Sequence, residues 1–531
     1  MRPNRHYLPN DGQYPFTGLN VRDPATMINP GMSPYLLNVQ ATRGVVKKRT
    51  GYRKLIDDKG GATLDQTIML LTHFETALGV RKLVCVTLDD QFLYDFASTQ
   101  WTDITKLDVE EEPVPWTGDE TNFVDCCSIT DSTGKYLIIT NGVDPPQKWD
   151  GDDPTFTDLD LSDGTITLFK TCEVFYNRLF VANVTVDGAT YKQSIAWSKA
   201  GAITDWSDAT AGSVLISDSK GDIEKLLTLA DRLVIYSTDS IGVCVYVGGA
   251  SQFSFEQLVK ETKLVSPRTI VPVGPYHFFM SQDNVFIFDG TRLIRPVGDL
   301  VSEDFRQHLN HDRLYEAHAY HDFVKRQVHW TIPFDETAHR TYVMEYDINN
   351  PMDVLWNVFE YSDRPTAVGF FYRDADFTCD CDLLAGVECD DVFFRCDAAG
   401  LRAEFPIKVM GDAASEVFMC DETAVLDDAT SVTATFDTKD FTTEQSYRST
   451  KTRWIELEVE MRGSAVTVSY SKDQGQNFTE IKTKTLTSQW TKYRLFFDAI
   501  SETIRFRFSS TSHFELKWLR VWHNPREGDQ E

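Results

Sequence analysis

The sequence lacks the features of a membrane protein and of several common enzyme classes. Its longest uncharged apolar runs have the length of a strand, and residues 1–6 lack the apolar stretch of a secretory signal. We therefore expect no membrane span, and synthesis in a cytoplasm. The patterns G-x-S-x-G, H-E-x-x-H and the P-loop are also missing, which argues against the hydrolases and nucleotide-binding enzymes that use them.

Paired cysteine motifs are missing as well, because none of the ten cysteines forms a C-x-x-C pair. Four lie in apolar strand patterns, where a thiol behaves as a small hydrophobic group: Cys85, Cys127, Cys172 and Cys244. A second group could bind zinc or form disulfides: Cys379, Cys381, Cys389 and Cys396. Its spacing fits no common zinc pattern. We expect buried thiols there, and neither a metal nor a cofactor in the chain.

Helical periodicity is scarce. Residues 303–317 are the best candidate for a short helix, and four histidines lie in or next to it: His308, His311, His318 and His321. No carboxylate stands at the spacing that a zinc-dependent hydrolase requires. The four histidines are therefore expected to be ordinary surface residues.

Basic residues are in deficit, and the deficit is confined to the middle of the chain. The 52 Lys and Arg residues face 80 Asp and Glu residues, for a net charge of −28. Residues 1–60 carry +6 and residues 426–531 carry −1, so residues 61–425 carry −33. Such a surface disfavours tight nucleic-acid binding because phosphate binding requires Lys and Arg. Solubility alone also explains an acidic surface.

What the sequence does contain is one strand-turn-strand unit that recurs seven times, with 42 to 54 residues between neighbouring units. The units centre on Leu83, Leu137, Leu179, Leu233, Phe278, Val328 and Cys379. Repeats of about 40 to 50 residues built from short strands are typical of a β-propeller. The sequence thus predicts an all-β protein with a propeller-like domain of about seven units over residues 61–405. An irregular array of β-sandwiches is the alternative.

The two ends of the sequence differ from the repeats. Residues 1–60 are rich in Pro, Gly and Asn and predict an extended arm that ends in a hairpin. The second strand of that hairpin carries Lys47, Lys48 and Arg49. These residues are candidates for docking on an acidic neighbouring subunit, or are simply a solvated strand edge.

Residues 406–531 predict a linker and a β-sandwich of jelly-roll type, because several strands alternate apolar and polar residues. The segment S-K-D-Q-G-Q-N-F over residues 471–478 resembles the Asp-box hairpin. In that motif Ser471, Asp473 and Gly475 would shape the turn, and Phe478 would anchor it in the core.

The arm and the repeats together resemble bacteriophage short-tail nozzle proteins, the packaged-DNA-stabilisation family that includes tail tubular protein B and tail accessory factors. The resemblance covers residues 15–300 and the sandwich departs from it. It is carried by segments including GLNVRDP at 18–24, INPG at 28–31, KKRTGY at 47–52, DRLVIYS at 231–237 and VFIFDG at 285–290.

The resemblance implies a structural virion protein of the tail, assembled in the host cytoplasm, and not an enzyme. Its subunits would form a hexameric ring below the portal and adaptor proteins. The ring would extend the DNA channel, retain the packaged genome and pass it at ejection. Its other partners would be tail fibre or needle proteins and, transiently, genomic double-stranded DNA.

Two other functions stay open at the level of sequence. A propeller-type glycan hydrolase would need an arginine cluster, for which Arg178, Arg232 and Arg268 are candidates, together with a pair of carboxylates. A receptor- or glycan-binding virion protein would use the aromatic residues of the sandwich. The candidates there are Trp490, Trp518 and Trp522; Trp454 and Trp518 are also expected in the core because they lie in alternating strands.

Overall fold

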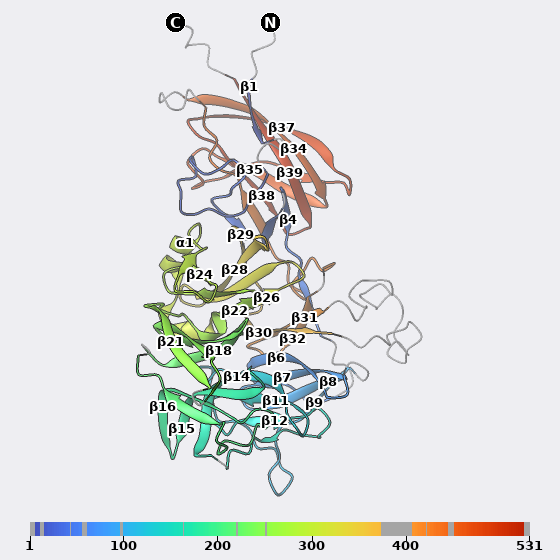
Figure 1. Ribbon diagram of the computed structural model, residues 1–531. Coiled ribbons are helices and arrows are strands. Elements are labelled where there is room, and N and C mark those ends of the chain that lie inside the picture. The colour runs from blue at the N-terminus through green and yellow to red at the C-terminus, as the bar shows by residue number, and fades with distance from the viewer. Residues whose placement is uncertain are drawn as a thin grey trace.

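The computed structural model describes residues 6–10, 15–42, 44–55, 61–95, 99–162, 164–218, 221–249, 252–372, 406–420, 422–443 and 451–524. Its regular structure is almost entirely antiparallel β-sheet. Figure 1 shows an elongated molecule in which a sandwich, drawn at the top, is stacked on a larger propeller. The fold is therefore all-β, as expected from the repeats.

The propeller consists of seven four-stranded sheets, the blades, which follow one another along the chain. Blade 1 contains β6 (Ile68–Glu75), β7 (Arg81–Thr87), β8 (Gln91–Asp95) and β9 (Gln100–Asp103). Blade 2 contains β10 (Asp125–Thr130), β11 (Lys135–Thr140), β12 (Gln147–Trp149) and β13 (Thr157–Asp158). Blade 3 contains β14 (Ile166–Phe175), β15 (Arg178–Val186), β16 (Ala189–Trp197) and β17 (Gly212–Leu215).

The remaining blades repeat this plan. Blade 4 contains β18 (Ile223–Leu229), β19 (Arg232–Ser237), β20 (Ser240–Tyr246) and β21 (Phe253–Lys260). Blade 5 contains β22 (Val271–Val273), β23 (Tyr276–Met280), β24 (Val285–Phe288) and β25 (Ile294–Pro296). Blade 6 contains β26 (His318–Asp322), β27 (Gln327–Phe334), β28 (Ala338–Asp347) and β29 (Asn350–Phe359). Blade 7 contains β30 (Pro365–Phe371), β31 (Ile407–Asp412), β32 (Val417–Cys420) and β5 (Tyr52–Lys54).

Blade strands are buried on both faces, which explains their continuous apolar runs. In β7, Leu83 and Cys85 join the core shared with blade 7. Val84 and Val86, which point to the opposite face, join the core shared with blade 2. The same sharing of apolar cores links blades 2 to 3, 3 to 4, 4 to 5 and 5 to 6. Blades 6 and 7 touch through their first strands, so the ring of seven is closed.

Six of the seven predicted unit centres lie on the second strand of a blade, from Leu83 on β7 to Val328 on β27. The seventh, Cys379, lies outside the described residues. The second strand of blade 7 is β31, and its fourth strand, β5, comes from the opposite end of the chain. The boundaries drawn at residues 60 and 405 are therefore wrong. Blade 7 takes strands from both sides of each of these boundaries.

The sandwich has two antiparallel sheets. In one, β3 (Val39–Thr42), β4 (Val45–Lys48), β39 (Phe514–Asn524), β34 (Thr452–Gly463) and β37 (Thr491–Ser501) follow in that order, and β1 (His6–Asn10) also pairs with β39. The other runs β2 (Leu36–Leu37), β33 (Ala434–Asp437), β38 (Arg505–Ser510), β35 (Ala465–Ser471) and β36 (Thr479–Thr485). The alternating strands expected near the C-terminus are found as β34, β35, β37, β38 and β39.

The N-terminal segment is not a separate arm. Its first four strands complete both sheets of the sandwich. Between them the chain crosses blade 6, where the amide of Leu19 donates to the carbonyl of Trp356 (2.8 Å) and that of Asn38 donates to the carbonyl of Val358 (2.9 Å). Phe16 lies edge-on to Phe436 in the sandwich, at 5.3 Å between ring centroids. One apolar core consequently spans the arm, blades 5 and 6, and the sandwich.

The predicted helical stretch forms α1 (Ser302–His308) and the 3-10 turn η3 (His311–Glu316); a second short 3-10 turn, η2, spans Pro267–Thr269. The histidines there do not converge. His308 Nδ1 lies 2.7 Å from Asp335 Oδ1, His321 Nε2 lies 2.8 Å from the Tyr346 hydroxyl, and His318 is buried. They do not form a common metal site within the described residues.

Candidate functional site

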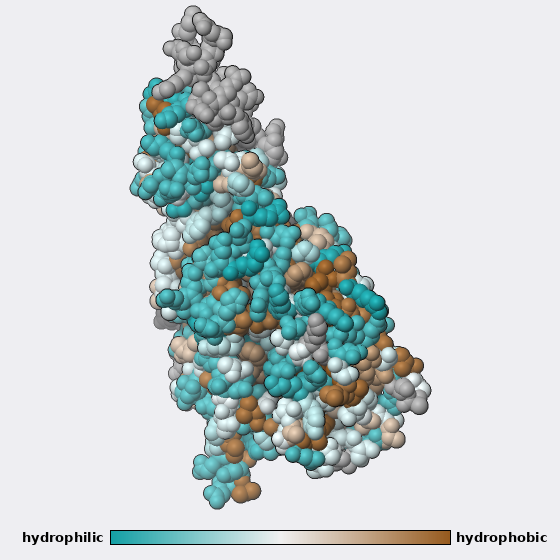
Figure 2. Space-filling view, turned by 90° about the vertical axis from the view of Figure 1, so that its left-hand side faces the viewer, coloured by the Kyte–Doolittle hydropathy of each residue, from teal (hydrophilic) through white to brown (hydrophobic). Residues whose placement is uncertain are grey.

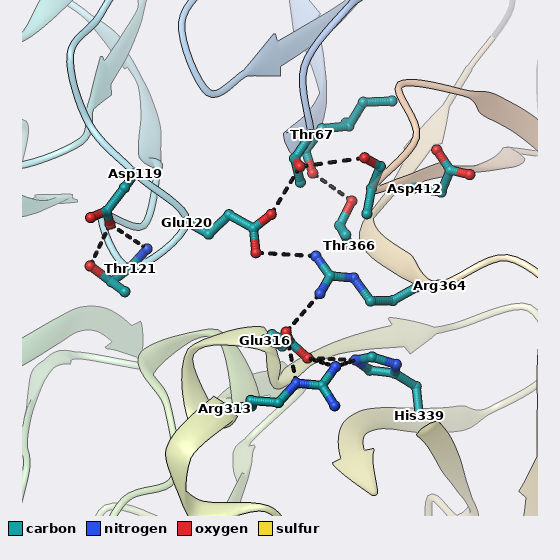
Figure 3. Close-up of polar contacts among 12 residues, drawn as sticks. Thr67, Asp119, Glu120, Thr121, Arg313, Glu316, His339, Arg364, Thr366 and Asp412 are labelled. Carbon is teal, nitrogen blue, oxygen red and sulfur yellow. Dashed lines mark hydrogen bonds and ion pairs between the residues drawn. The ribbon is translucent and has the colours of Figure 1, made fainter. Parts of the chain in front are cut away.

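Polar and charged side chains from five blades meet at the end of the propeller axis where the first strands of the blades begin. Residues that precede these strands necessarily lie at the same end, because all first strands run the same way. The axial cluster comprises Thr67, Glu120, Arg268, Arg313, Glu316, His318, His339 and Arg364. Figure 3 shows most of its members, drawn from segments up to about 300 residues apart.

Glu316 is the centre of the axial cluster. Its carboxylate oxygens lie 2.6 Å from the Arg313 guanidinium, 2.6 Å from His339 Nε2 and 2.8 Å from the Arg364 guanidinium. The side chain of Glu316 is only 5% exposed. Burial alone would raise the pKa of Glu316. The hydrogen bonds from His339 and Arg313 and the charge of Arg364 lower it instead to about 2. Glu316 is therefore a permanent anion at neutral pH.

Arg364 extends the cluster to blades 1 and 2. Its Nη2 lies 3.2 Å from Glu120 Oε2, and the hydroxyl of Thr67 donates to Glu120 Oε1 at 3.0 Å (Figure 3). Removing one member of such a buried network leaves its partners unpaired. The arrangement therefore locks blades 1, 2, 6 and 7 together at one end of the axis.

Arg268 adds a positive charge that has no carboxylate within 4.0 Å among the described residues. It donates to the carbonyl of Thr366 and lies 6.0 Å from the ring centroid of Phe123. Burial, followed by repulsion from Arg364, lowers its pKa to about 10. Burial and the charge of Arg268 also lower the pKa of His318 to about 3. Neither group changes its protonation state near neutral pH.

The arginines expected for a hydrolase do not come together. Arg178 donates to the carbonyls of Ser198 (2.9 Å) and Thr210 (2.8 Å), and Arg232 donates to the carbonyl of Gly290 (2.7 Å). Arg178 thus holds segments of blade 3, and Arg232 of blade 4 holds the turn that follows β24 of blade 5. The arginines that do converge with Arg268 are Arg313 and Arg364. A general acid or base needs a pKa near neutrality, and the axial cluster holds its carboxylate Glu316 far from that range.

A cluster of three acidic residues lies elsewhere on blade 1. The carboxylate oxygens of Asp65, Asp89 and Asp90 lie within 4.8 Å of one another. Burial, and then the charges of Asp89, Asp103 and Asp65, raise the pKa of Asp90 to about 6. Exposed acidic groups of this kind are common in proteins without a bound ion.

The three basic residues predicted to dock a subunit differ in their exposure to solvent. Lys47 is exposed on β4, whereas Lys48 and Arg49 are 3% and 5% exposed. Arg49 forms a two-pronged ion pair with Asp427 (2.6 and 2.7 Å) and donates to the carbonyl of Glu360 (2.6 Å). β4 lies between β3 and β39, so it is not a sheet edge. Of the three, only Lys47 has an exposed side chain.

The segment resembling an Asp box does form a tight turn. Asp473 Oδ1 accepts from the Ser471 hydroxyl (2.6 Å) and from the amide of Asn477 (2.9 Å). Gly475 has φ +91°, a backbone conformation that favours glycine. Phe478 is only half-buried, with the Arg507 guanidinium 3.7 Å from its ring centroid. The expectation that Phe478 anchors the turn in the core is wrong.

The aromatic candidates of the sandwich lie on its surface or in its core, depending on which face of the strand their side chains point to. Trp454 is fully buried, as expected. Trp518 is half-buried on the outer face of β39, so its expected core position is wrong. Cations already lie near the candidate stacking rings: Arg462 is 4.7 Å from the centroid of Trp490, and Lys492 is 5.1 Å from that of Trp518.

Cys85, Cys127, Cys172 and Cys244 are buried free thiols on blade strands, as expected. The cluster of Cys379, Cys381, Cys389 and Cys396 lies outside the described residues. The described part of the chain contains no helix long and apolar enough to cross a membrane.

Comparisons with known proteins give structural similarity alone. No protein-family model and no curated protein sequence matches the chain. One similar structure is BBS1N, solved in complex with ARL6DN: 11% identity, TM-score 0.37, covering 71% of this chain and 99% of that one. Another is Hsv2p of Kluyveromyces lactis, with 11% identity, TM-score 0.28 and coverage of 52% and 80%. A mutant of the family 29 carbohydrate-binding module CBM29-2 has 14% identity and TM-score 0.14, covering 18% and 60%.

Proposed function

We propose that the chain is a structural subunit of a short bacteriophage tail, a nozzle protein that forms a ring below the portal and adaptor. The ring extends the DNA channel, retains the packaged genome and passes it at ejection. Its neighbours in the virion are further copies of itself, the portal and adaptor, and the tail fibre or needle proteins. This role requires no catalysis.

The observation that carries the proposal is that the propeller region is strongly acidic and that several basic residues form internal ion pairs. Residues 61–425 carry a net charge of −33, and several of the cations in the chain are used in internal ion pairs. Examples are Arg49 with Asp427, Arg364 with Glu316, and Lys408 with Asp322. The surface that remains is acidic. DNA would slide along such a wall without binding, because binding requires cations that replace the counterions of the phosphates.

Two further features support a rigid ring subunit. β1–β4 belong to the sandwich and β5 belongs to blade 7, and backbone hydrogen bonds from Leu19 and Asn38 to blade 6 hold the two domains together. The axial cluster ties several blades together at one end. An acidic wall cannot hold DNA by attraction, so retention in this account needs a physical gate formed by loops.

The test has two arms. Native mass spectrometry of the purified chain, alone and with the portal and adaptor proteins, should show a closed ring of about six copies that joins the portal complex. In the virion, replacing acidic residues that face the DNA with Lys should slow ejection, because phosphates would then adhere to the wall. A monomer that ignores the portal complex, or unchanged ejection kinetics, would contradict the proposal.

A further inference from the structure

A pocket of about 360 Å³ lies where the propeller meets the sandwich. Its walls are β4, the segment of residues 422–425 after blade 7, and the turn that enters β39. The volume falls within the range of about 300 to 1,000 Å³ in which proteins bind ligands. We call it the lysine pocket because Lys47, Lys48 and Lys325 line it.

The charges of the lysine pocket are only partly compensated. Lys325 lies 3.5 Å from Glu422, and His513 lies 3.3 Å from Glu515. Lys47 and Lys48, by contrast, have no carboxylate within 4.0 Å among the described residues. Glu515 is the cross-strand neighbour of Lys47 where β4 pairs with β39, but its carboxylate lies against Arg462 (2.7 Å) and His513 (3.3 Å).

Lys48 is the more informative of the two. It is 3% exposed, and the carbonyl of Thr511 is the acceptor of its ammonium within the described structure. An ammonium has three N–H donors, so hydrogen-bonding capacity remains. Burial, and then the charge of Arg49, lower the pKa of Lys48 to about 8. An anion in the pocket would relieve this cost.

An acidic feature lies at the end of the propeller that is far from the sandwich. Residues 108–112 (DVEEE) form the tip of a loop that we call the acidic finger, which projects from the lower end of the propeller in Figures 1 and 2. Val109 is 99% exposed. The finger is nevertheless ordered, because Asp108 Oδ1 accepts the amides of Glu110 (2.7 Å) and Glu112 (3.0 Å).

We propose that the acidic finger of one copy binds in the lysine pocket of the next copy. The inference rests on the proposed self-assembly and identifies a contact that would drive it. A finger does not reach the pocket of its own chain, because the pocket lies where the propeller meets the sandwich and the finger lies at the far end of the propeller (Figure 1). The contact is therefore head-to-tail, and such contacts generate rings when the rotation closes. Opposite charge gives it specificity.

The experiment is a charge-swap cycle on the full-length chain, read by sedimentation velocity and native mass spectrometry. The finger variant is Glu110→Lys/Glu111→Lys, and the pocket variant is Lys47→Glu; all three side chains are exposed. We expect each to weaken self-association by about tenfold or more, and the triple variant to recover most of that loss. The matched controls, Asp152→Lys/Asp153→Lys and Lys482→Glu, should leave association unchanged.

The outcomes separate this inference from the proposed function. If the wild type and all variants form the ring, the finger-pocket contact is overturned and the ring stands. The same holds if the triple variant loses as much self-association as the two separate losses combined. Open chains or dimers that respond to the charge swap would support the contact and contradict the ring. A wild-type monomer would overturn both. Loss of duplex DNA binding in Lys47→Glu, with association intact, would assign the pocket to phosphate and overturn the contact.

Discussion

Arg49 connects the N-terminal segment to the propeller through buried ionic contacts. It pairs with Asp427, its Nε donates to Asn38 Oδ1 (2.9 Å), and its guanidinium lies 4.6 Å from the ring centroid of Tyr361. Removing one partner of a buried ion pair leaves an uncompensated charge, which costs about 3–5 kcal/mol. We therefore expect Arg49→Ala to lower the free energy of unfolding by about that amount in urea titrations.

Lys47→Ala is the matched control, since Lys47 is exposed on the same strand and surface substitutions change stability by about 0.5 kcal/mol or less. Equal effects of the two substitutions would show that the buried pair with Asp427 contributes little.

Glu316 predicts a pH dependence of stability. Its pKa is about 2 in the folded chain, below the usual 4.5. A carboxyl group with a lowered folded pKa contributes stability that is full above the unfolded pKa and is lost as pH falls toward the folded one. Glu316→Gln should thus be less stable than the wild type at pH 7, and the difference should shrink between pH 4.5 and about 2. Chemical denaturation at several pH values measures this.

Glu75→Gln, on an exposed carboxylate at the end of β6, should show no such convergence. A Glu316→Gln deficit that stays constant down to pH 2 would mean that hydrogen-bond geometry, and not the ionised carboxylate, accounts for the stabilisation.

The members of the axial cluster were mostly beyond the reach of sequence. Arg268 could be singled out as one of three arginines of the repeats, but Glu120, Glu316 and Arg364 carry no local signal. They meet because ring closure brings together segments up to about 250 residues apart. For Lys48 and Arg49 the sequence did carry a local signal, but the prediction drawn from it was wrong. Their run suggested a solvated edge, whereas both are buried where the sandwich meets the propeller, with Arg49 paired to Asp427.

At the scale of elements, the short strands near the N-terminus bind the two domains to each other. β4 and β1 pair with β39, β2 pairs with β33, and β5 pairs with β32. The hairpin at residues 35–52 could be predicted from its turn and alternation. Its partners could not, because pairing over more than 350 residues leaves no periodic signal in the chain.

This topology predicts that residues 426–531 do not fold alone. Without β1–β4, the inner edge of β39 and the apolar core around Phe436 would be exposed. We expect the isolated fragment to show little cooperative unfolding by circular dichroism, and a fusion that adds residues 1–50 through a flexible linker to restore it. A scrambled 50-residue segment is the control. Cooperative unfolding of the isolated fragment would contradict the shared sandwich.

At the scale of the whole molecule, charge is the property that links fold to function. The repeat region holds 27 basic and 60 acidic residues, so the intact chain should not bind duplex DNA at physiological ionic strength. An electrophoretic mobility assay checks this, with a basic DNA-binding protein as the positive control. Micromolar binding at 150 mM salt would contradict an acidic wall.

The central claim is that copies of this chain surround a path for DNA. Electron cryomicroscopy of the assembled tail tests it most directly. The account predicts a closed ring of this chain below the portal and adaptor, with acidic propeller residues facing the lumen. A lumen lined by Lys and Arg, or this chain at a peripheral position with no ring, would contradict it.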